Sequence, residues 1–460
     1  MSLSAVILAA GKGRRMKSAL PKVLHEVMGR PMLRYTIDAV RPLKPQKMVV
    51  VIGNGAEAVR NRLSDEDHLS FVVQEKLLGT GNAVAIAVGE LLEGVVLVLN
   101  GDCPLITTKT LKDLIKKHQR SRNVLSFLSF IDDSMPGYGR ILRDERGRVS
   151  GIVEDKHATP AERKKFKELN GGVYVMETGV LNYLDRIKKN GSSGEYYLTD
   201  IVGLVSGEGK KLEAYTCPAE ELRGVNTRKE LYEISNIVRE RIIEKWMDRG
   251  VTFIDPETSF VHPSVSIGAE SVVYPNTYLE GSTEIGKNCI IYPGARIQDS
   301  VLGNNVVVKD NTLIEESRIG DESAIGPFAH LRPKSVIGRN AKIGNFVEIK
   351  KSSIGDGSKA SHLTYLGDAV VGSDVNIGAG TITCNYDGKN KFTTVIESGV
   401  FIGSDTQLVA PVTVGSGAYV AAGSTITKNV PSGALAITRI KQKNLEGWAN
   451  KRKLKVKSEK

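Results

Sequence analysis

The chain is poor in the residues and runs that mark several common classes of protein. It has four cysteines in 460 residues, and Cys103, Cys217, Cys289 and Cys384 lack the close spacing of zinc sites or disulfide frameworks. No apolar run approaches the roughly 18 residues that a membrane-spanning helix needs. The N-terminus has no basic segment before its short apolar run, which argues against a signal peptide. We therefore expect a cytoplasmic protein with no membrane-embedded part.

Histidine is also scarce, whereas basic residues are in excess and give a net charge of +11. Part of this excess lies in the C-terminal tail, at Lys451, Arg452, Lys453, Lys455, Lys457 and Lys460. The tail is either a solvated, partly disordered end or a source of attraction for anionic ligands. No basic patch interleaved with aromatic residues indicates nucleic-acid binding. We expect small-molecule partners, with neither nucleic acid nor a membrane among them.

The most regular feature of the chain is an aliphatic residue that recurs about every six positions in the C-terminal half. This ladder begins Val261, Ile267, Val273, Leu279 and ends Val414, Val420, Ile426. A period of six fits neither a helix nor a simple alternating strand, but it fits a short strand and a turn, repeated. Three steps would close one coil of a parallel β-helix. The period does not indicate where functional residues lie, so a purely structural prism remains an alternative.

Glycine often follows a ladder residue, and we expect Gly and Asn to take the turn positions that need positive φ. The glycines in question include Gly268, Gly286, Gly303, Gly320, Gly326, Gly338 and Gly355. The ladder is interrupted between Thr383 and Ile396. This interruption predicts a loop that leaves the coil, and such loops on rigid scaffolds concentrate binding residues.

The repeat resembles the left-handed β-helix of the hexapeptide acyltransferases. Members of that family form trimers, with acyl-CoA in the grooves between neighbouring prisms. The resemblance therefore implies a homotrimer that uses an acyl-CoA.

The N-terminal half reads as alternating strands and helices. Residues 4–10, 48–53, 71–74 and 95–102 are apolar runs typical of buried parallel strands. The alternation predicts a doubly wound, Rossmann-like α/β domain, in which ligands bind at the carboxyl ends of the strands. Gly11, Gln74 and Asp102 fall at such ends, and the Gly11–Gly13 turn has backbone N–H groups that could hold phosphate. An ordinary turn and a helix-capping Asp are the alternatives.

A series of short motifs runs through this half in a fixed order. They are Leu8-Ala9-Ala10-Gly11-Lys12-Gly13-Arg14-Arg15-Met16, Pro21-Lys22, Leu78-Gly79-Thr80-Gly81, Gly101-Asp102, Gly137-Tyr138-Gly139-Arg140-Ile141, Val153-Glu154-Asp155-Lys156, Asn170-Gly171-Gly172 and Gly224-Val225-Asn226. The series is similar to that of the sugar-1-phosphate nucleotidyltransferases. Together with the ladder, the chain from Leu3 to about Arg439 resembles the bifunctional N-acetylglucosamine-1-phosphate uridylyltransferase/glucosamine-1-phosphate N-acetyltransferase family.

The resemblance implies a first site in the N-terminal half. Arg15 and Lys22 would act on the triphosphate of UTP, and Asp102 and Asn226 would hold Mg²⁺ through oxygen ligands. The remaining positions implied for the nucleotide and the sugar are Leu8, Ala9, Ala10, Gly11, Gln74, Gly79, Thr80, Asn100, Gly101, Gly139, Glu154 and Asn170. Asn100, Arg14 and the Gly81-Asn82 pair depart from the residues common in the family, next to the metal and the base.

The resemblance implies a second site on the ladder. His362 would be the general base that deprotonates the amine of glucosamine-1-phosphate, as suits an imidazole near neutral pH. Arg332, Lys350, Tyr365, Asn376 and Lys391 would bind the sugar phosphate. Acetyl-CoA would contact Ala379, Asn385, Tyr386, Ser404, Ala422 and Arg439. A plain surface histidine is the alternative for His362, and a thiol intermediate at Cys384 is disfavoured because direct attack needs no covalent step.

Between the halves, Leu231, Ile234, Val238, Ile242 and Trp246 have the three- and four-residue spacing of an amphipathic helix. We expect a uridylyltransferase domain at 1–227, a linker helix at 228–250 and an acetyltransferase domain at 251–460. The main alternative is a single-activity nucleotidyltransferase with a structural β-helix. The cluster around His362 favours two activities, because a scaffold would not require it.

Overall fold

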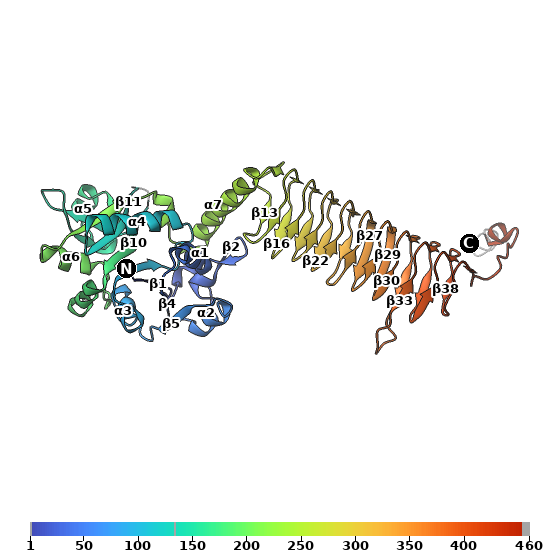
Figure 1. Ribbon diagram of the computed structural model, residues 1–460, viewed down its shortest axis with the longest axis horizontal. Coiled ribbons are helices and arrows are strands. Elements are labelled where there is room, and N and C mark those ends of the chain that lie inside the picture. The colour runs from blue at the N-terminus through green and yellow to red at the C-terminus, as the bar shows by residue number, and fades with distance from the viewer. Residues whose placement is uncertain (1, 133–134, 453–460) are drawn as a thin grey trace, which may run out of the picture. The chain divides into compact units, whose positions relative to one another are not determined.

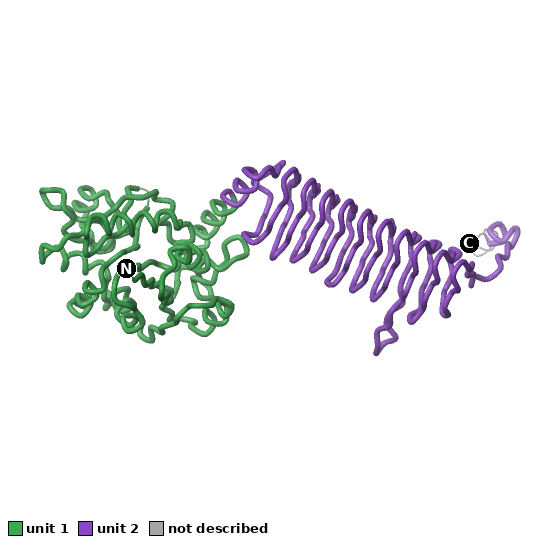
Figure 2. The backbone as a smooth tube through the Cα atoms, in the orientation of Figure 1, with its two compact units in different colours: residues 1–239 green, residues 240–460 purple. Residues whose placement is uncertain are grey.

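The computed structural model describes residues 2–132 and 135–452, so four of the tail lysines, Lys453, Lys455, Lys457 and Lys460, lie outside the described residues. The chain forms two compact units, Met1–Arg239 and Glu240–Lys460 (Figure 2). The division falls within helix α7 (Arg228–Met247), which occupies most of the expected linker. In the described part of the chain no helix is both long and apolar enough to cross a bilayer.

Unit 1 is built on a mixed β-sheet in the order β11-β7-β10-β6-β1-β4-β5, with β8 paired to β10 and β9 paired to β8 (Figure 1). Strand β1 pairs in parallel with β4 and β6, whereas β10 is antiparallel to β6 and β7. The strands are β1 (Leu3–Leu8), β4 (Lys47–Ile52), β5 (Leu69–Val73), β6 (Val95–Asn100), β7 (Leu125–Ile131), β8 (Arg140–Arg143), β9 (Val149–Val153), β10 (Glu168–Glu177) and β11 (Leu212–Thr216), beside a small hairpin of β2 (Glu26–Val27) and β3 (Arg30–Pro31).

Helices cover both faces of this sheet and make it the middle of three layers. Ile7 belongs to one buried cluster with residues of α1 and α4, and Val6 belongs to the other with residues of α3 and α6. Neighbouring residues of β1 thus point to opposite faces, which explains why the run is continuously apolar. The helices are α1 (Met32–Val40), α2 (Ala56–Arg62), α3 (Thr80–Ala85), α4 (Thr108–Ser121), α5 (Pro160–Lys165) and α6 (Asp200–Gly207).

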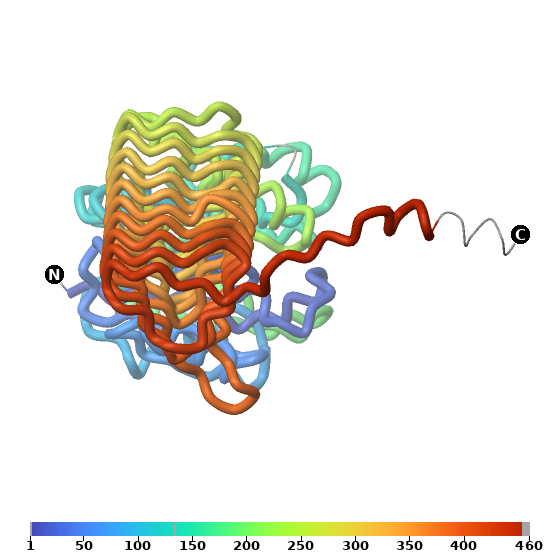
Figure 3. Tube along the Cα trace, turned by 90° about the vertical axis from the view of Figure 1, so that its right-hand side faces the viewer, coloured from blue at the N-terminus to red at the C-terminus, as the bar shows by residue number. Residues whose placement is uncertain are grey.

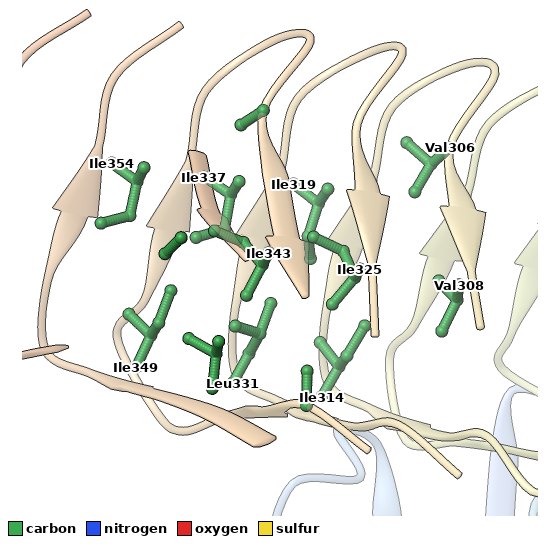
Figure 4. Packing of buried hydrophobic residues seen from close by; sticks show 14 of the residues in the cluster. Val306, Val308, Ile314, Ile319, Ile325, Leu331, Ile337, Ile343, Ile349 and Ile354 are labelled. Carbon is green, nitrogen blue, oxygen red and sulfur yellow. The ribbon is translucent and has the colours of Figure 1, made fainter. Parts of the chain in front are cut away.

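Unit 2 is a parallel β-helix in which each strand pairs with the strand one coil later. Val261 pairs with Leu279, Ile267 with Ile285 and Val273 with Ile291, so three ladder steps make one coil, as the period predicted. Successive coils stack in register (Figure 3). Every ladder residue from Val261 to Ile426 is at most 5% exposed, and these side chains form a continuous column inside the coils (Figure 4).

The coils present three columns of strands. The first is β12 (Thr252–Phe253), β15 (Val272–Val273), β18 (Ile290–Ile291), β21 (Val307–Val308), β24 (Ala324–Ile325), β27 (Lys342–Lys350), β29 (Lys359–Gly367), β31 (Asn376–Ile377), β34 (Phe401–Ile402), β37 (Tyr419–Val420) and β39 (Leu435–Ala436). The second is β13 (Phe260–Val261), β16 (Tyr278–Glu280), β19 (Arg296–Gln298), β22 (Leu313–Glu315), β25 (His330–Leu331), the ends of β27 and β29, β32 (Ile382–Cys384), β35 (Gln407–Val409) and β38 (Thr425–Ile426). The third is β14 (Ser266–Ile267), β17 (Glu284–Ile285), β20 (Val301–Leu302), β23 (Arg318–Ile319), β26 (Val336–Ile337), β28 (Ser353–Ile354), β30 (Ala369–Val371), β33 (Thr394–Ile396) and β36 (Val412–Val414).

The glycines that follow ladder residues serve a different purpose from the one expected. Gly268 and Gly286 do not have positive φ, and a Cβ on Gly268 would lie 2.6 Å from the carbonyl carbon of Gly286. These positions need glycine because successive coils approach closely there. Positive φ occurs two residues later, at Asn288 and Asn305. The expectation for glycine was therefore wrong at most of these positions, although Gly326 does have a φ of +92°.

Candidate functional sites

A pocket of about 560 Å³ in unit 1 lies at the end of β6. Six of the predicted positions line it, namely Arg15, Asn100, Asp102, Gly139, Asn170 and Asn226. These residues come from segments spread over more than two hundred positions of sequence. The sheet brings them together, and Asp102 lies two residues after the last residue of β6, Asn100.

Lys22 lies against the two residues predicted to hold a metal. Its ammonium forms an ion pair with Asp102 Oδ2 and donates a hydrogen bond to Asn226 Oδ1 at 3.2 Å. The partners are 80 and 204 positions away in sequence. A carboxylate and an amide oxygen therefore converge on one cationic group, and Glu230 fixes the second of them by accepting hydrogen bonds from the backbone of Asn226 and Thr227.

The end of β1 is held mainly by its backbone. Ala9 N–H donates to Val51 at 2.8 Å, Leu8 accepts from Gly101 N–H at 2.9 Å, and the side chains of Ala9 and Ala10 are buried. Gly11 has open space where a Cβ would project. Any ligand contact at Ala9, Ala10 or Gly11 would therefore involve main-chain groups and the exposed face of Gly11, whereas the Leu8 side chain is only partly buried.

Gln74 and the turn before α3 form a second predicted group. The Gln74 amide donates to Gly79 O at 3.1 Å and to Asn82 Oδ1 at 2.8 Å, while Thr80 Oγ1 accepts from Leu198 N–H at 3.0 Å. Asn82, one of the departures from the family pattern, thus orients Gln74. Gly79 cannot carry a side chain, because its φ is +98° and a Cβ would meet Tyr196 O at 2.5 Å.

Two side chains that sequence reasoning missed position the predicted sugar-binding residues. Thr199 Oγ1 donates to Glu154 Oε1 at 2.7 Å, and Asn170 Nδ2 donates to Tyr174 Oη at 2.7 Å. Burial raises the pKa of Tyr174, which keeps its hydroxyl protonated. No motif marks Thr199, which is 45 positions from its partner. Tyr138 was within a quoted motif, and its hydroxyl accepts from Gly224 N–H at 3.0 Å.

In unit 2 the histidine predicted as a base lies on an unusual pair of strands. β27 and β29 have nine residues each, whereas the other strands of the β-helix have two or three. Asn345 of β27 is in register with His362 of β29, and His362 Nδ1 lies 2.6 Å from Asn345 Oδ1. His362 is exposed.

Residues that stand two positions after a ladder residue stack on one another from coil to coil, and one of these stacks contains His362. Asn345 and His362 are in register on neighbouring coils. Backbone hydrogen bonds continue this stacking on later coils: Ala379 O accepts from Asp405 N–H at 2.7 Å, and Ser404 O accepts from Gly423 N–H at 2.8 Å. We call this set the His362 column: Asn345, His362, Ala379, Ser404 and Ala422. Three of the predicted acetyl-CoA contacts thus stack beyond His362, and Arg439 donates to Ala422 O at 3.0 Å.

Three cationic side chains gather on the neighbouring surface. The positive charges of Lys391 and then Arg332 lower the pKa of Lys350, and Arg332 also donates to Glu348 Oε1 at 2.8 Å. Lys391 comes from the interrupting loop, which is closed by a bridge between Tyr386 and Lys391 and projects from the stack (Figure 1). Mutual repulsion of ammonium groups favours a bound anion.

Of the remaining predicted positions, Tyr365 and Asn385 lie near this surface, and Asn376 lies in another register. Gly367 is in register with Lys350, one coil later. The Tyr365 hydroxyl lies against Gly367, only 2.3 Å from the position that a Cβ on this glycine would take. Asn385 Nδ2 donates to Asp368 Oδ2 at 2.5 Å. Asn376 begins β31, in register with Lys359 rather than with Lys350 or Tyr365.

Comparison with known proteins agrees with both halves of the chain. A family model of the MobA-like NTP transferase domain matches residues 5–137, and one of the bacterial transferase hexapeptide (six repeats) matches residues 393–428. A third, the GMPPB C-terminal domain, matches residues 256–338. The fold and these family models together define a nucleotidyltransferase domain joined to a left-handed hexapeptide-repeat transferase domain.

Full-length relatives narrow this class. The bifunctional protein GlmU of Thermodesulfovibrio yellowstonii is 47% identical over 98% of this chain and 100% of its own length. Those of Clostridium novyi and Heliobacterium modesticaldum are each 49% identical, over 99% and 98% of this chain and 100% and 98% of their own lengths. The chain belongs to the GlmU family and is a bifunctional enzyme of UDP-N-acetylglucosamine synthesis, with acetyltransferase and uridylyltransferase activities.

Proposed function

We propose that uridylyl transfer takes place in the pocket of unit 1. A phosphate oxygen of N-acetylglucosamine-1-phosphate attacks the α-phosphorus of UTP in line, and pyrophosphate leaves. No protein nucleophile is needed, so the residues act by positioning and by neutralising charge. Arg15 and Lys22 stabilise the triphosphate, while Glu154 and Asn170, held by Thr199 and Tyr174, orient the sugar.

We propose Mg²⁺ as the metal of this reaction. The observation that best supports the site is that Lys22 binds both Asp102 and Asn226, because these two oxygens already converge on one positive charge. A carboxylate and an amide oxygen are donors that a hard cation accepts, and Mg²⁺ usually adds waters and substrate phosphates to such a pair. When bound there, the ion would neutralise developing charge on the phosphates. Lys22 would then turn from Asp102 toward the triphosphate.

We propose that acetyl transfer takes place beside His362. Arg332, Lys350 and Lys391 bind the phosphate of glucosamine-1-phosphate, with Tyr365 and Asn376 orienting the sugar. His362 accepts a proton from the amine, whose nitrogen attacks the thioester carbonyl of acetyl-CoA, and coenzyme A leaves as the thiol. Acetyl-CoA lies along Ala379, Ser404 and Ala422, with Asn385, Tyr386 and Arg439 beside it.

The test is a pair of assays on two variants. Asp102→Ala should lower uridylyl transfer, read as pyrophosphate release, by about 100-fold or more and leave acetyl transfer intact. His362→Ala should lower acetyl transfer, read as free thiol, by about 10²–10⁴-fold and leave uridylyl transfer intact. If Asp102→Ala lost neither activity, the metal assignment would be wrong. If His362→Ala were fully active, His362 would not be the general base.

The assembly and location of the enzyme are proposed from the same family. The hexapeptide repeats support a homotrimer, in which acetyl-CoA would lie between neighbouring prisms. Its substrates are soluble phosphates and thioesters, which supports a cytoplasmic location.

A further inference from the structure

The structure places an amide against the ring nitrogen of His362 that faces away from the proposed acetyl-CoA contacts. In the His362 column, Asn345 is one coil before His362, and Ala379 and Ser404 follow on later coils. Asn345 Oδ1 lies 2.6 Å from His362 Nδ1. An amide oxygen can only accept, so this contact requires the proton of a neutral imidazole to be on Nδ1.

The backbone around this pair keeps the contact in place. β27 and β29 remain paired through the corner, with Asn345↔His362 in register between Ile343↔Ala360 and Val347↔Thr364. Phe346 and Leu363, the next residues on both strands, have φ values of +57° and +46°. The chain turns in the same way on both coils, and the two side chains that precede the turn therefore meet.

We propose that Asn345 is the positioning residue of the acetyltransferase. By accepting the Nδ1–H of His362, it leaves Nε2 unprotonated and able to take the proton from the attacking amine. This role rests on the proposed function of His362 as general base. It is a positioning role, because Asn345 would act on the reaction only through its contact with His362.

The test compares two substitutions at one position. Asn345→Ala removes the acceptor, lets the ring rotate and change tautomer, and should lower kcat for acetyl transfer by about 10–100-fold. The KM for acetyl-CoA and uridylyl transfer should stay within about twofold. Asn345→Asp keeps an acceptor, so kcat should stay within about threefold at its plateau. The added carboxylate should also move the acidic limb of the pH–rate profile to higher pH, because it stabilises the imidazolium.

A second readout follows the ring directly. Nitrogen NMR of the protein labelled in histidine should show the His362 ring, assigned by its loss in His362→Ala, with the proton on Nδ1, and this preference should weaken in Asn345→Ala. Lys342→Ala, at the start of the same strand, is the matched control and should change neither readout.

The outcomes separate this inference from the proposed function. If His362→Ala keeps acetyl transfer, the general base is wrong and the role of Asn345 is lost with it. If His362→Ala is inactive but Asn345→Ala matches the native rate and pH profile, only the positioning role is overturned. An inactive, folded Asn345→Asp enzyme would also overturn it, because it would mean that the amide N–H₂ donates to His362.

Discussion

The two units assemble their candidate sites in opposite ways. In unit 1 Lys22 contacts Asp102, 80 positions away, and Asn226, 204 positions away. The sheet in this unit is mixed and its strand order requires crossovers. In unit 2 Asn345 and His362 are 17 positions apart, which is one coil, and Arg332 contacts Glu348 on the next coil at a separation of 16. A solenoid turns sequence spacing directly into distance, because each repeat contacts only its neighbours.

This difference predicts that the two units fail for different reasons. The β-helix is vulnerable to any atom added between coils, whereas unit 1 is vulnerable at single long-range contacts and at its buried ionisable groups. Three measurements sharpen the comparison, from the largest expected effect to the smallest.

Gly355→Ala should destabilise unit 2 by about 2–3 kcal/mol, in the range of overpacked sites. The new Cβ would lie 2.5 Å from the carbonyl carbon and oxygen of Gly372, and these backbone atoms cannot move without shifting a coil. After brief heating at increasing temperatures, acetyl transfer should be lost several degrees earlier than in the native enzyme, with uridylyl transfer unchanged.

The matched control is Gly417→Asn, at a turn with φ +62° and open space around it. Asparagine adopts this conformation readily, so little change is expected. Equal stability of Gly355→Ala and the native enzyme would mean that the coils can separate locally, against a stack of closely spaced backbones.

Acid should weaken unit 1 through its buried histidines. His118 is 1% exposed, and burial lowers its pKa despite the opposing effect of Glu177. Burial and then Arg228 lower the pKa of His25 as well. Below about pH 6.5 these histidines bind protons in the unfolded chain but not in the folded one. The free energy of unfolding therefore decreases as the pH is lowered, by up to about 1.4 kcal/mol per pH unit for each proton.

The measurement is uridylyl transfer that survives heating at pH values from 7.5 down to 5, assayed at neutral pH. The variant His118→Gln should flatten the dependence. His330→Gln, at a partly exposed histidine that contacts Glu315, should not. A slope unaffected by His118→Gln would show that other groups govern the acid sensitivity of unit 1.

The smallest effect is expected at Thr199→Val, which removes one hydrogen bond to Glu154. Loss of about 1 kcal/mol corresponds to a rise of roughly fivefold in the KM for N-acetylglucosamine-1-phosphate. Ser206→Ala on α6 also deletes a hydrogen bond, to Val149 O at 3.0 Å, but outside the predicted site, and should leave this KM unchanged. If both variants behaved alike, Thr199 would have no specific effect on sugar binding.

How far the sequence predicted each unit follows from this contrast. The ladder predicted the β-helix, its coil length and every buried position that it named, because one rule repeats at each step. The role expected for the glycines was wrong at most positions: glycine is required there by the close approach of successive coils, and that distance is not a property of a single turn. The apolar runs predicted strands β1, β4, β5 and β6 of the α/β unit, but Thr199 and Tyr174 carried no local signal.

By itself the sequence determined which residues are buried and how often the chain turns, since hydrophobic spacing and turn chemistry act over a few residues. Only the tertiary structure decided that Lys22 meets Asp102 and Asn226, that Thr199 reaches Glu154, and that Asn345 faces the Nδ1 of His362. Those contacts depend on how strands pair, and pairing brings together side chains whose separation along the chain gives no measure of their distance in space.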